Sequence, residues 1–246
     1  MRTVGRSAAL VSVLLAATTS AWPASVVRTE PPLQDFFAKL LDCGGIPVRS
    51  SAAVDDLALE LACGKIAMML RDVPAARSRL IARGAELHVI GRNEVTSDLP
   101  EFRSKRGVVF AERGRLWTID TRTRGKGGLK ASCGEENLLR LPADRYRGQD
   151  ICVHEFAHDI MNVGFTNAQR ARIRARHVAA RDAGLWPGSY TISDAMEYWA
   201  ELSMWYFGGR GDRRMQGPPP ADGPAGLRAY DPKGFELLDE LYHARE

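Results

Sequence analysis

The sequence His154-Glu155-Phe156-Ala157-His158 decides the interpretation of this chain, because it places two histidines four residues apart in an apolar stretch. Apolar residues recur at helical spacing through residues 150–163, so we predict one helix there. Side chains four residues apart project from the same face of a helix, one turn apart. The two histidines therefore face one point beside the helix, with Glu155 next to the first.

These side chains are the groups that a zinc hydrolase needs. Neutral imidazoles are common zinc ligands, and two histidines at this spacing can hold one ion. A glutamate beside the first histidine can accept a proton from water that the ion activates. The pattern predicts His154 and His158 as ligands of one Zn²⁺ ion and Glu155 as the general base. The alternative, two surface histidines beside an incidental glutamate, fits poorly with the apolar back of the helix.

A third ligand has to come from elsewhere in the chain. The three-histidine form of the motif needs glycine and histidine where this chain has Met161 and Gly164, so that form is excluded. Glu197 and Glu201 lie four apart in the apolar stretch 193–207, which we predict to be a helix. We expect Glu197 to be the third metal ligand. We expect Glu201 to accept a hydrogen bond from a ligand histidine.

Glu197 also has a purely structural interpretation. Asp194 and Glu197 fit a capping box, in which the two side chains bond the first backbone N–H groups of a helix. The helix is strongly apolar, however, and a carboxylate on its inward face needs a counter-charge such as a metal ion.

The two motifs together resemble the catalytic domain of anthrax lethal factor and its relatives, which include the clostridial Pro-Pro endopeptidases. The similarity consists of residues 154–158, then Tyr190, then Glu197-Tyr198-Trp199-Ala200-Glu201, and covers roughly the last third of the chain. It implies a zincin-like metallopeptidase in which Glu197 is a zinc ligand. It also implies that Tyr190 assists catalysis by donating its phenolic O–H to the developing oxyanion.

The chain departs from that family in two respects. Tyr198 and Trp199 stand where family members usually carry phenylalanines, and the predicted N-terminal helices and the Pro-rich loop match no family feature that we recognise. Substrate preference therefore does not transfer with the resemblance.

The remaining sequence predicts an α+β fold. Helical periodicity covers residues 31–42, 54–72, 74–84, 150–163, 166–182, 193–207 and 231–244. Strand-like runs cover residues 85–90, 107–110, 116–120 and 137–141. We expect a zincin-like domain with N-terminal helices, a small mixed or antiparallel sheet, the metal helix and a helical C-terminal half.

Two further segments carry expectations. Residues 130–141 are predicted to supply an edge strand beside which an extended substrate lies. The Gly- and Pro-rich stretch 208–226 is predicted to be a loop. It contains Arg210-Gly211-Asp212, a tripeptide sometimes interpreted as a cell-adhesion signal, and we expect that match to be incidental.

The first residues have the pattern of a secretory signal peptide. Arg2 and Arg6 precede a short apolar run, and small residues follow at positions 19–21. We expect residues 1–21 to be removed. Residues 22–84 should form an N-terminal helical segment and residues 85–246 the catalytic domain. We expect the two parts, residues 22–246, to fold as one unit. No other segment is apolar enough to cross a bilayer, so we expect a secreted or periplasmic protein without a membrane partner.

The cysteines agree with export. The chain has four, Cys43, Cys63, Cys133 and Cys152, and an even number in an exported protein indicates disulfides. Pairing of sequence neighbours, Cys43 with Cys63 and Cys133 with Cys152, is the simplest of the possible connectivities. The second bridge would hold the start of the metal helix.

The charge pattern argues against a nucleic-acid partner. The chain has 34 basic and 30 acidic residues, and the excess is spread along it. The alternating arginines of residues 170–176 would fan out around a helix instead of forming one stripe.

The sequence as a whole predicts hydrolysis of peptide bonds in a peptide or protein substrate. A zinc amidase acting on cell-wall or other non-protein amides would use the same metal and base. A non-catalytic zinc-binding interaction module is a third possibility, but a structural site has no use for the base Glu155. Cleavage preference and oligomeric state have no signature in the sequence.

Overall fold

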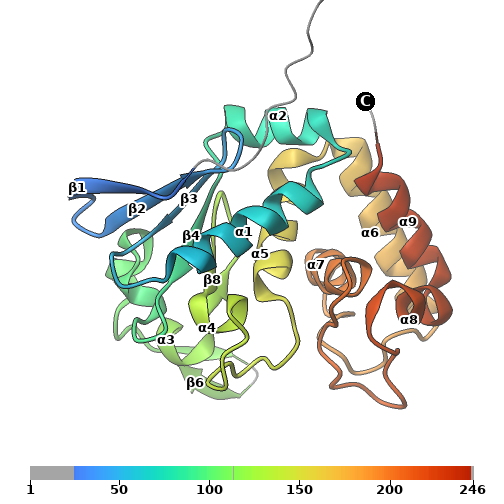
Figure 1. Cartoon of the computed structure of the whole chain (residues 1–246). Helices are drawn as coiled ribbons and strands as arrows, with labels where there is room; N and C mark the ends of the chain where they lie inside the picture. Colours follow the sequence, from blue (N-terminus) through green and yellow to red (C-terminus); the bar gives the residue numbers. More distant parts are fainter. Residues whose placement is uncertain (1–24, 113, 245–246) are drawn as a thin grey trace, which may run out of the picture.

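The computed structural model describes residues 25–112 and 114–244, and it has an α+β architecture in which helices cover a mixed sheet (Figure 1). The expected signal peptide, residues 1–21, lies outside the described residues. Within the described ranges, no helix combines the length and the apolar character needed to cross a membrane.

The strands are β1 (Val27–Leu33), β2 (Phe37–Asp42), β3 (Pro47–Ser50), β4 (Glu86–Ile90), β5 (Phe110–Glu112), β6 (Arg115–Trp117), β7 (Gly125–Lys126) and β8 (Lys130–Gly134). The α-helices are α1 (Asp56–Met69), α2 (Pro74–Ala82), α3 (Ile119–Arg122), α4 (Glu135–Leu138), α5 (Ile151–Asp159), α6 (Asn167–Asp182), α7 (Ala195–Tyr206), α8 (Gly223–Tyr230) and α9 (Pro232–Tyr242). Shorter turns are the 3-10 helices η1 (Thr96–Asp98) and η2 (Pro100–Lys105) and the π-helical turn η3 (Ile160–Gly164).

The main sheet has the strand order β1-β2-β3-β4-β8-β7. The central pairs β3–β4 and β4–β8 are parallel, and the outer pairs are antiparallel. Helices α1 and α2 connect β3 to β4, as a parallel pair requires a crossover connection. Strands from before and after residue 84 therefore share one sheet.

Helix α5 lies between this sheet and the C-terminal helices (Figure 1). It packs against β8 and α1 on one side and against α7 on the other. Val89 of β4, Phe156 of α5 and Trp199 of α7 belong to one buried cluster. The largest core thus surrounds the helix that carries the histidine motif.

The prediction of a helix over residues 31–42 was wrong, because this segment forms the hairpin of β1 and β2. Gln34 and Asp35 adopt positive φ angles at its turn. Side chains of β2 alternate between more and less buried positions, which is the period of a strand. The phenylalanines and leucines at 36, 37, 40 and 41 fit both periods, and pairing with β3 selects the strand.

The later strand predictions need a second correction. Residues 107–110 and 116–120 contribute to β5 and β6, which form a separate two-stranded sheet. Residues 137–141 are not a strand, because α4 ends at Leu138. The expected edge strand at 130–141 is also wrong, since β8 is paired on both sides and β7 is the last strand of the sheet.

The helix predictions for residues 54–72, 74–84, 150–163, 166–182, 193–207 and 231–244 are confirmed with shifted ends. Local signals account for several of these ends. Asp55 caps α1, and Thr166 and Gln169 form a capping box at α6. The predicted loop 208–226 is confirmed except that α8 begins inside it, at Gly223.

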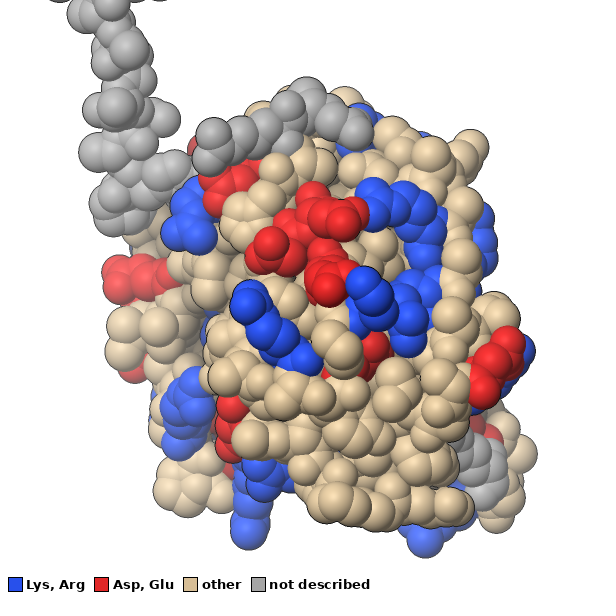
Figure 2. Space-filling model, turned by 90° about the vertical axis from the view of Figure 1, so that its right-hand side faces the viewer, with Lys and Arg blue, Asp and Glu red and all other residues tan. Residues whose placement is uncertain are grey.

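Charges of both signs are interspersed on the face formed by the C-terminal helices (Figure 2). The arginines of α6 leave the helix in different directions, as predicted. Arg170 donates to the carbonyls of Asn162 and Phe165, Arg172 pairs with Glu240 of α9, and Arg176 lies beside Asp231.

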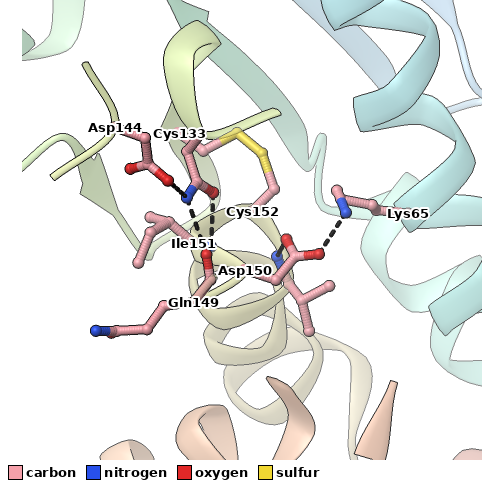
Figure 3. Close-up of a disulfide and its surroundings, with 9 residues drawn as sticks. Lys65, Cys133, Asp144, Gln149, Asp150, Ile151 and Cys152 are labelled. Atoms are coloured by element: carbon pink, nitrogen blue, oxygen red, sulfur yellow. Dashed lines mark hydrogen bonds and ion pairs between the residues drawn. A yellow bond between two sulfur atoms is a disulfide. The ribbon is translucent and has the colours of Figure 1, made fainter. Parts of the chain in front are cut away.

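Both disulfides join sequence neighbours, Cys43 with Cys63 and Cys133 with Cys152, as predicted. The second bridge links β8 to the first turn of α5 (Figure 3). Asp150 caps the same turn by accepting from Val153 N at 3.2 Å, and Lys65 of α1 pairs with Asp150. The start of α5 is therefore held by a covalent bond, a cap and an ion pair.

Removing either disulfide should lower stability by a similar amount. The bridged cysteines are 20 and 19 residues apart. We expect C43A/C63A and C133A/C152A each to lose about 3 kcal/mol of unfolding free energy, because loops of this size cost similar chain entropy. Urea unfolding measures both. A loss below about 1 kcal/mol in one pair alone would contradict the loop-entropy account.

His88 in β4 is fully buried between two carboxylates. Its Nδ1 lies 2.6 Å from Glu101 Oε1 and its Nε2 3.1 Å from Glu86 Oε2. Burial lowers the pKa of His88, but Glu101 and Glu86 together raise it above its ordinary value.

This raised pKa predicts a pH-dependent contribution to stability. The folded protein binds the His88 proton more tightly than the unfolded chain does, where the pKa is about 6.5. The stabilisation is present below about pH 6.5 and is lost as pH rises through the folded pKa. We expect the stability difference between wild type and H88Q to shrink from pH 5.5 to pH 8.5 in urea titrations. A difference that stays constant or widens would contradict this.

Candidate active site

His154 and His158 of α5 and Glu197 of α7 converge on one point. The two Nε2 atoms are 3.2 Å apart, and Glu197 Oε2 lies 3.2 Å from His154 Nε2 and 3.7 Å from His158 Nε2. Both histidines are buried, and Glu197 is half-buried. The structure thus brings together three side chains that the sequence separates by 39 and 43 positions.

The packing of α7 on α5 places Glu197 there. The indole N–H of Trp199 donates to the carbonyl of Ala157 at 3.0 Å, between the two histidines in sequence. Asp194 caps α7 by accepting from Met196 N and Glu197 N at 2.8 and 3.0 Å. Only half of the possible capping box is present, because the Glu197 carboxylate turns toward the histidines.

The three donor atoms have the spacing that a zinc ion requires. With Zn–N and Zn–O distances of about 2.0–2.1 Å, adjacent ligand atoms of a tetrahedral site lie about 3.3–3.4 Å apart. The separations of 3.2, 3.2 and 3.7 Å bracket this value. Glu197 Oε2 is a buried atom that faces both imidazole Nε2 atoms. Two imidazoles and a carboxylate also match zinc in chemistry, so these residues could hold it.

The electrostatics of the cluster favour a positive charge at this point. Burial lowers the pKa of His154, but hydrogen bonding to Glu197 and the charges of Glu155 and Glu201 raise it to about 9. Burial raises the pKa of Glu197, but His154 and His158 lower it to about 2. Three carboxylates thus surround two imidazoles, an arrangement that a divalent cation would neutralise.

Glu155 lies on the same helix as the histidines and lines the open side of the site, half-buried. Burial raises the pKa of this carboxyl, which also accepts a hydrogen bond from the backbone N–H of Gly127. The arrangement leaves a carboxylate beside the point where the three donors meet, as proton transfer to or from a bound water requires.

A glycine-rich segment that follows β7 is packed directly on α5. A Cβ at Gly127 would lie 2.7 Å from His158 Cβ, and a Cβ at Gly125 would lie 2.6 Å from Ile151 Cγ2. Gly128 N donates to buried Asp159 at 2.8 Å. The close approach of this backbone to the helix thus requires residues without side chains.

Glu201 contacts His154 at Nδ1, the ring nitrogen that does not face the other donor atoms. Its Oε1 lies 3.4 Å from His154 Nδ1, and its Oε2 accepts from Asp212 N at 2.6 Å. Gly211 passes so close to Glu201 and Trp205 that a Cβ would overlap them. Two residues of the Arg210-Gly211-Asp212 tripeptide, Gly211 and Asp212, thus contact Glu201 and help to hold it.

Tyr190 lies in the turn before α7 and is half-buried beside Glu197. Its hydroxyl shares a hydrogen bond with the Glu197 carboxylate, and the Arg122 guanidinium donates to it. Arg122 also pairs with Glu112 at 3.0 Å, which connects the β5–β6 hairpin to this tyrosine. A phenol therefore points into the site next to the convergence point.

These residues lie in a cleft of about 1500 Å³. Its walls include the β5–β6 hairpin, β7 and the 210–214 loop. A second, smaller cavity of about 360 Å³ lies beside Lys65 and Asp150 and contains none of the site residues.

Sequence analysis missed Gly127, Arg122, Asp159 and Asp212. The run Gly125-Lys126-Gly127-Gly128 did carry a signal, because clustered glycines indicate close backbone approach. Arg122 and Asp212 carried none, since their partners are distant in sequence.

No protein-family model matches this sequence, and no curated protein matches it either. Among solved structures, the fold is similar to that of the Pro-Pro endopeptidase PPEP-2 from Paenibacillus alvei, with a TM-score of 0.46 and 16% sequence identity. The match covers 72% of this chain and 91% of that one.

A methyl group at Gly127 should disturb the site. We expect G127A to bind zinc at least about tenfold more weakly, because its Cβ must displace His158 or the β7 backbone. Zinc affinity is measured by competition with a chromophoric chelator. G64A is the matched control, since a Cβ in α1 meets nothing within 4 Å. Equal zinc affinities in G127A and G64A would contradict the packing argument.

Proposed function

We propose that this chain is a secreted or periplasmic zinc metallopeptidase of the glutamate-ligated zincin type. The observation that carries the proposal is the convergence of His154 Nε2, His158 Nε2 and Glu197 Oε2 at tetrahedral spacing beside Glu155. One Zn²⁺ ion bound there would polarise a carbonyl group and acidify water. Three protein donors leave a position open, which is typical of a catalytic zinc site.

Glu155 is the general base of this proposal. Its carboxylate lines the cleft and accepts a hydrogen bond from the backbone N–H of Gly127, which orients it. It accepts the proton of the attacking water and then donates it to the leaving amine. Proton transfer by a positioned carboxylate contributes about 10²–10⁴ in rate.

Tyr190 and Glu201 assist in different ways. The Tyr190 hydroxyl lies beside Glu197, where it donates to the oxygen on which negative charge develops. Arg122 holds this phenol in place. Glu201 fixes the orientation of the His154 ring through Nδ1.

The shape of the cleft supports a peptide substrate. Strand β7 ends the sheet, and Gly125, Lys126 and Gly127 line the cleft next to Glu155. An extended peptide can pair its backbone with such an edge, and the scissile carbonyl then lies near the base.

Two substitutions separate catalysis from metal binding. We expect E155Q to bind one zinc ion per chain and to lose about 10²–10⁴ of its peptidase activity, because the base is removed and the donors remain. We expect E197Q to lose zinc affinity and activity together. Metal analysis of the purified proteins and cleavage of a mixed peptide library measure the two properties.

Activity unchanged in E155Q would overturn the mechanism. Chelation of wild type should abolish cleavage, and added Zn²⁺ should restore it. Cleavage of peptidoglycan amides but of no peptide would instead establish the amidase. Zinc binding without any hydrolysis would indicate an interaction module.

A further inference from the structure

The acidic residues of the cleft are already engaged within the protein. Glu112 pairs with Arg122, and Asp212 forms a bidentate pair with Arg214, whose Nη2 lies 2.7 Å from Asp212 Oδ2. Glu201 accepts from Asp212 N, and Glu197 faces the histidines. Glu155 is then the only carboxylate among the described lining residues that faces the open cleft without an ion-pair partner.

Several cations of the same cleft have no acidic partner in the part of the chain that the structure describes. Among the described residues, Lys126, Arg115, Arg145 and Arg210 line the cleft and form no ion pair with a carboxylate. Arg210 donates to the Arg147 carbonyl, and Arg145 to the Thr121 carbonyl and the Tyr146 hydroxyl. These contacts satisfy hydrogen-bond donors but leave the positive charges uncompensated.

Lys126 has the most informative position of the four. It is exposed on the edge strand β7, between the two glycines that pack on α5. It lines the cleft together with Glu155, and the next residue, Gly127, packs directly on His158. A substrate paired with β7 would therefore carry its residues nearest the cleaved bond past the Lys126 ammonium group.

Arg115 and Arg145 are two further positively charged residues that line the cleft. Arg115 is exposed at the start of β6 in the hairpin, and Arg145 is exposed in the segment before α5. The cations thus lie on β7, in the β5–β6 hairpin and in the segment before α5, all of which line the cleft. The uncompensated charge surrounds the cleft instead of forming one isolated contact.

We propose that this cleft selects acidic peptides, with Lys126 pairing with an aspartate or glutamate close to the cleaved bond and Arg115 and Arg145 with acidic residues farther along. This inference rests on the proposed peptidase function and names its substrate class. Complementary charge in a cleft raises the association rate and rejects substrates of the wrong sign. An exposed ion pair contributes up to about fivefold in affinity, so several are needed for strong selection.

The first experiment finds the preference without assuming it. The zinc-loaded protein is incubated with an unbiased peptide library, and the cleaved bonds are identified by mass spectrometry. We expect Asp and Glu to be enriched within about two residues of the cleaved bond, because side chains of an edge-paired strand pass Lys126 at that distance. An even distribution, or enrichment of Lys and Arg, would overturn the inference.

The second experiment assigns the preference to Lys126. Three peptides that differ only in Glu, Gln or Lys at the enriched position are compared. We expect kcat/KM to fall in that order for wild type. K126M should lower the ratio of kcat/KM for the Glu peptide to that for the Gln peptide by about two- to fivefold. K126E should prefer the Lys peptide.

K233M is the matched control, because Lys233 is an exposed lysine of α9 paired with Glu236 outside the cleft. It should keep the wild-type order of the three peptides. The preference should also weaken as ionic strength rises. Identical preferences in K126E and wild type would overturn the role of Lys126.

A binding measurement separates this inference from the proposed function. The E155Q variant is titrated with the same three peptides, fluorescently labelled, and anisotropy is recorded. Tighter binding of the Glu peptide supports charge selection even if no peptide is ever hydrolysed by wild type. Cleavage of all three peptides at equal rates would retain the peptidase and overturn only the acidic preference.

Discussion

Trp199 donates its indole N–H to the carbonyl of Ala157, and this hydrogen bond joins α7 to α5 at the level of the histidines. The same indole stacks on Tyr242 and meets Phe165 edge-on, so the contact lies deep in the main core. Glu197 and Glu201 lie two residues to either side of Trp199. The packing of one side chain therefore brings both carboxylates against His154, and the rest of the site depends on it.

Bringing carboxylates into the protein interior creates a second constraint, because a buried charge needs compensating groups. Backbone N–H groups supply many of them. Gly127 donates to Glu155, Gly128 to Asp159 and Asp212 to Glu201. Each donor belongs to a loop that approaches α5 or α7 closely. Glycine at 125, 127 and 211 permits this approach. The glycines thus matter here for the absence of a side chain more than for conformational freedom.

The two ends of the site differ in how firmly they are held. The start of α5 is joined to β8 by the Cys133–Cys152 disulfide and is capped by Asp150. The two histidines therefore lie on a helix whose first turn is fixed to the sheet. The cleft side is formed by the short strand β7, the β5–β6 hairpin and a loop. The two histidines, whose positions must be fixed, thus lie on a helix. The surface that would contact a substrate is formed by short strands and loops, which generally tolerate sequence variation.

The sequence by itself determined the local features: the helix that carries His154, Glu155 and His158, the capped helices around it, the neighbour disulfides and the candidates Glu197 and Glu201. Such features depend on residues within one or two turns, or on a short list of partners, so periodicity and spacing suffice to find them. Tertiary structure decided the rest. The stretch 31–42 fits both helical and strand periods, and only pairing of β2 with β3 makes it a hairpin. Tertiary structure also decided the edge strand, the Arg122–Tyr190 contact and the Asp212–Glu201 hydrogen bond. Each of these joins residues that are far apart in the chain. No local sequence pattern encodes such contacts, because they form only when the helices pack around the buried charges.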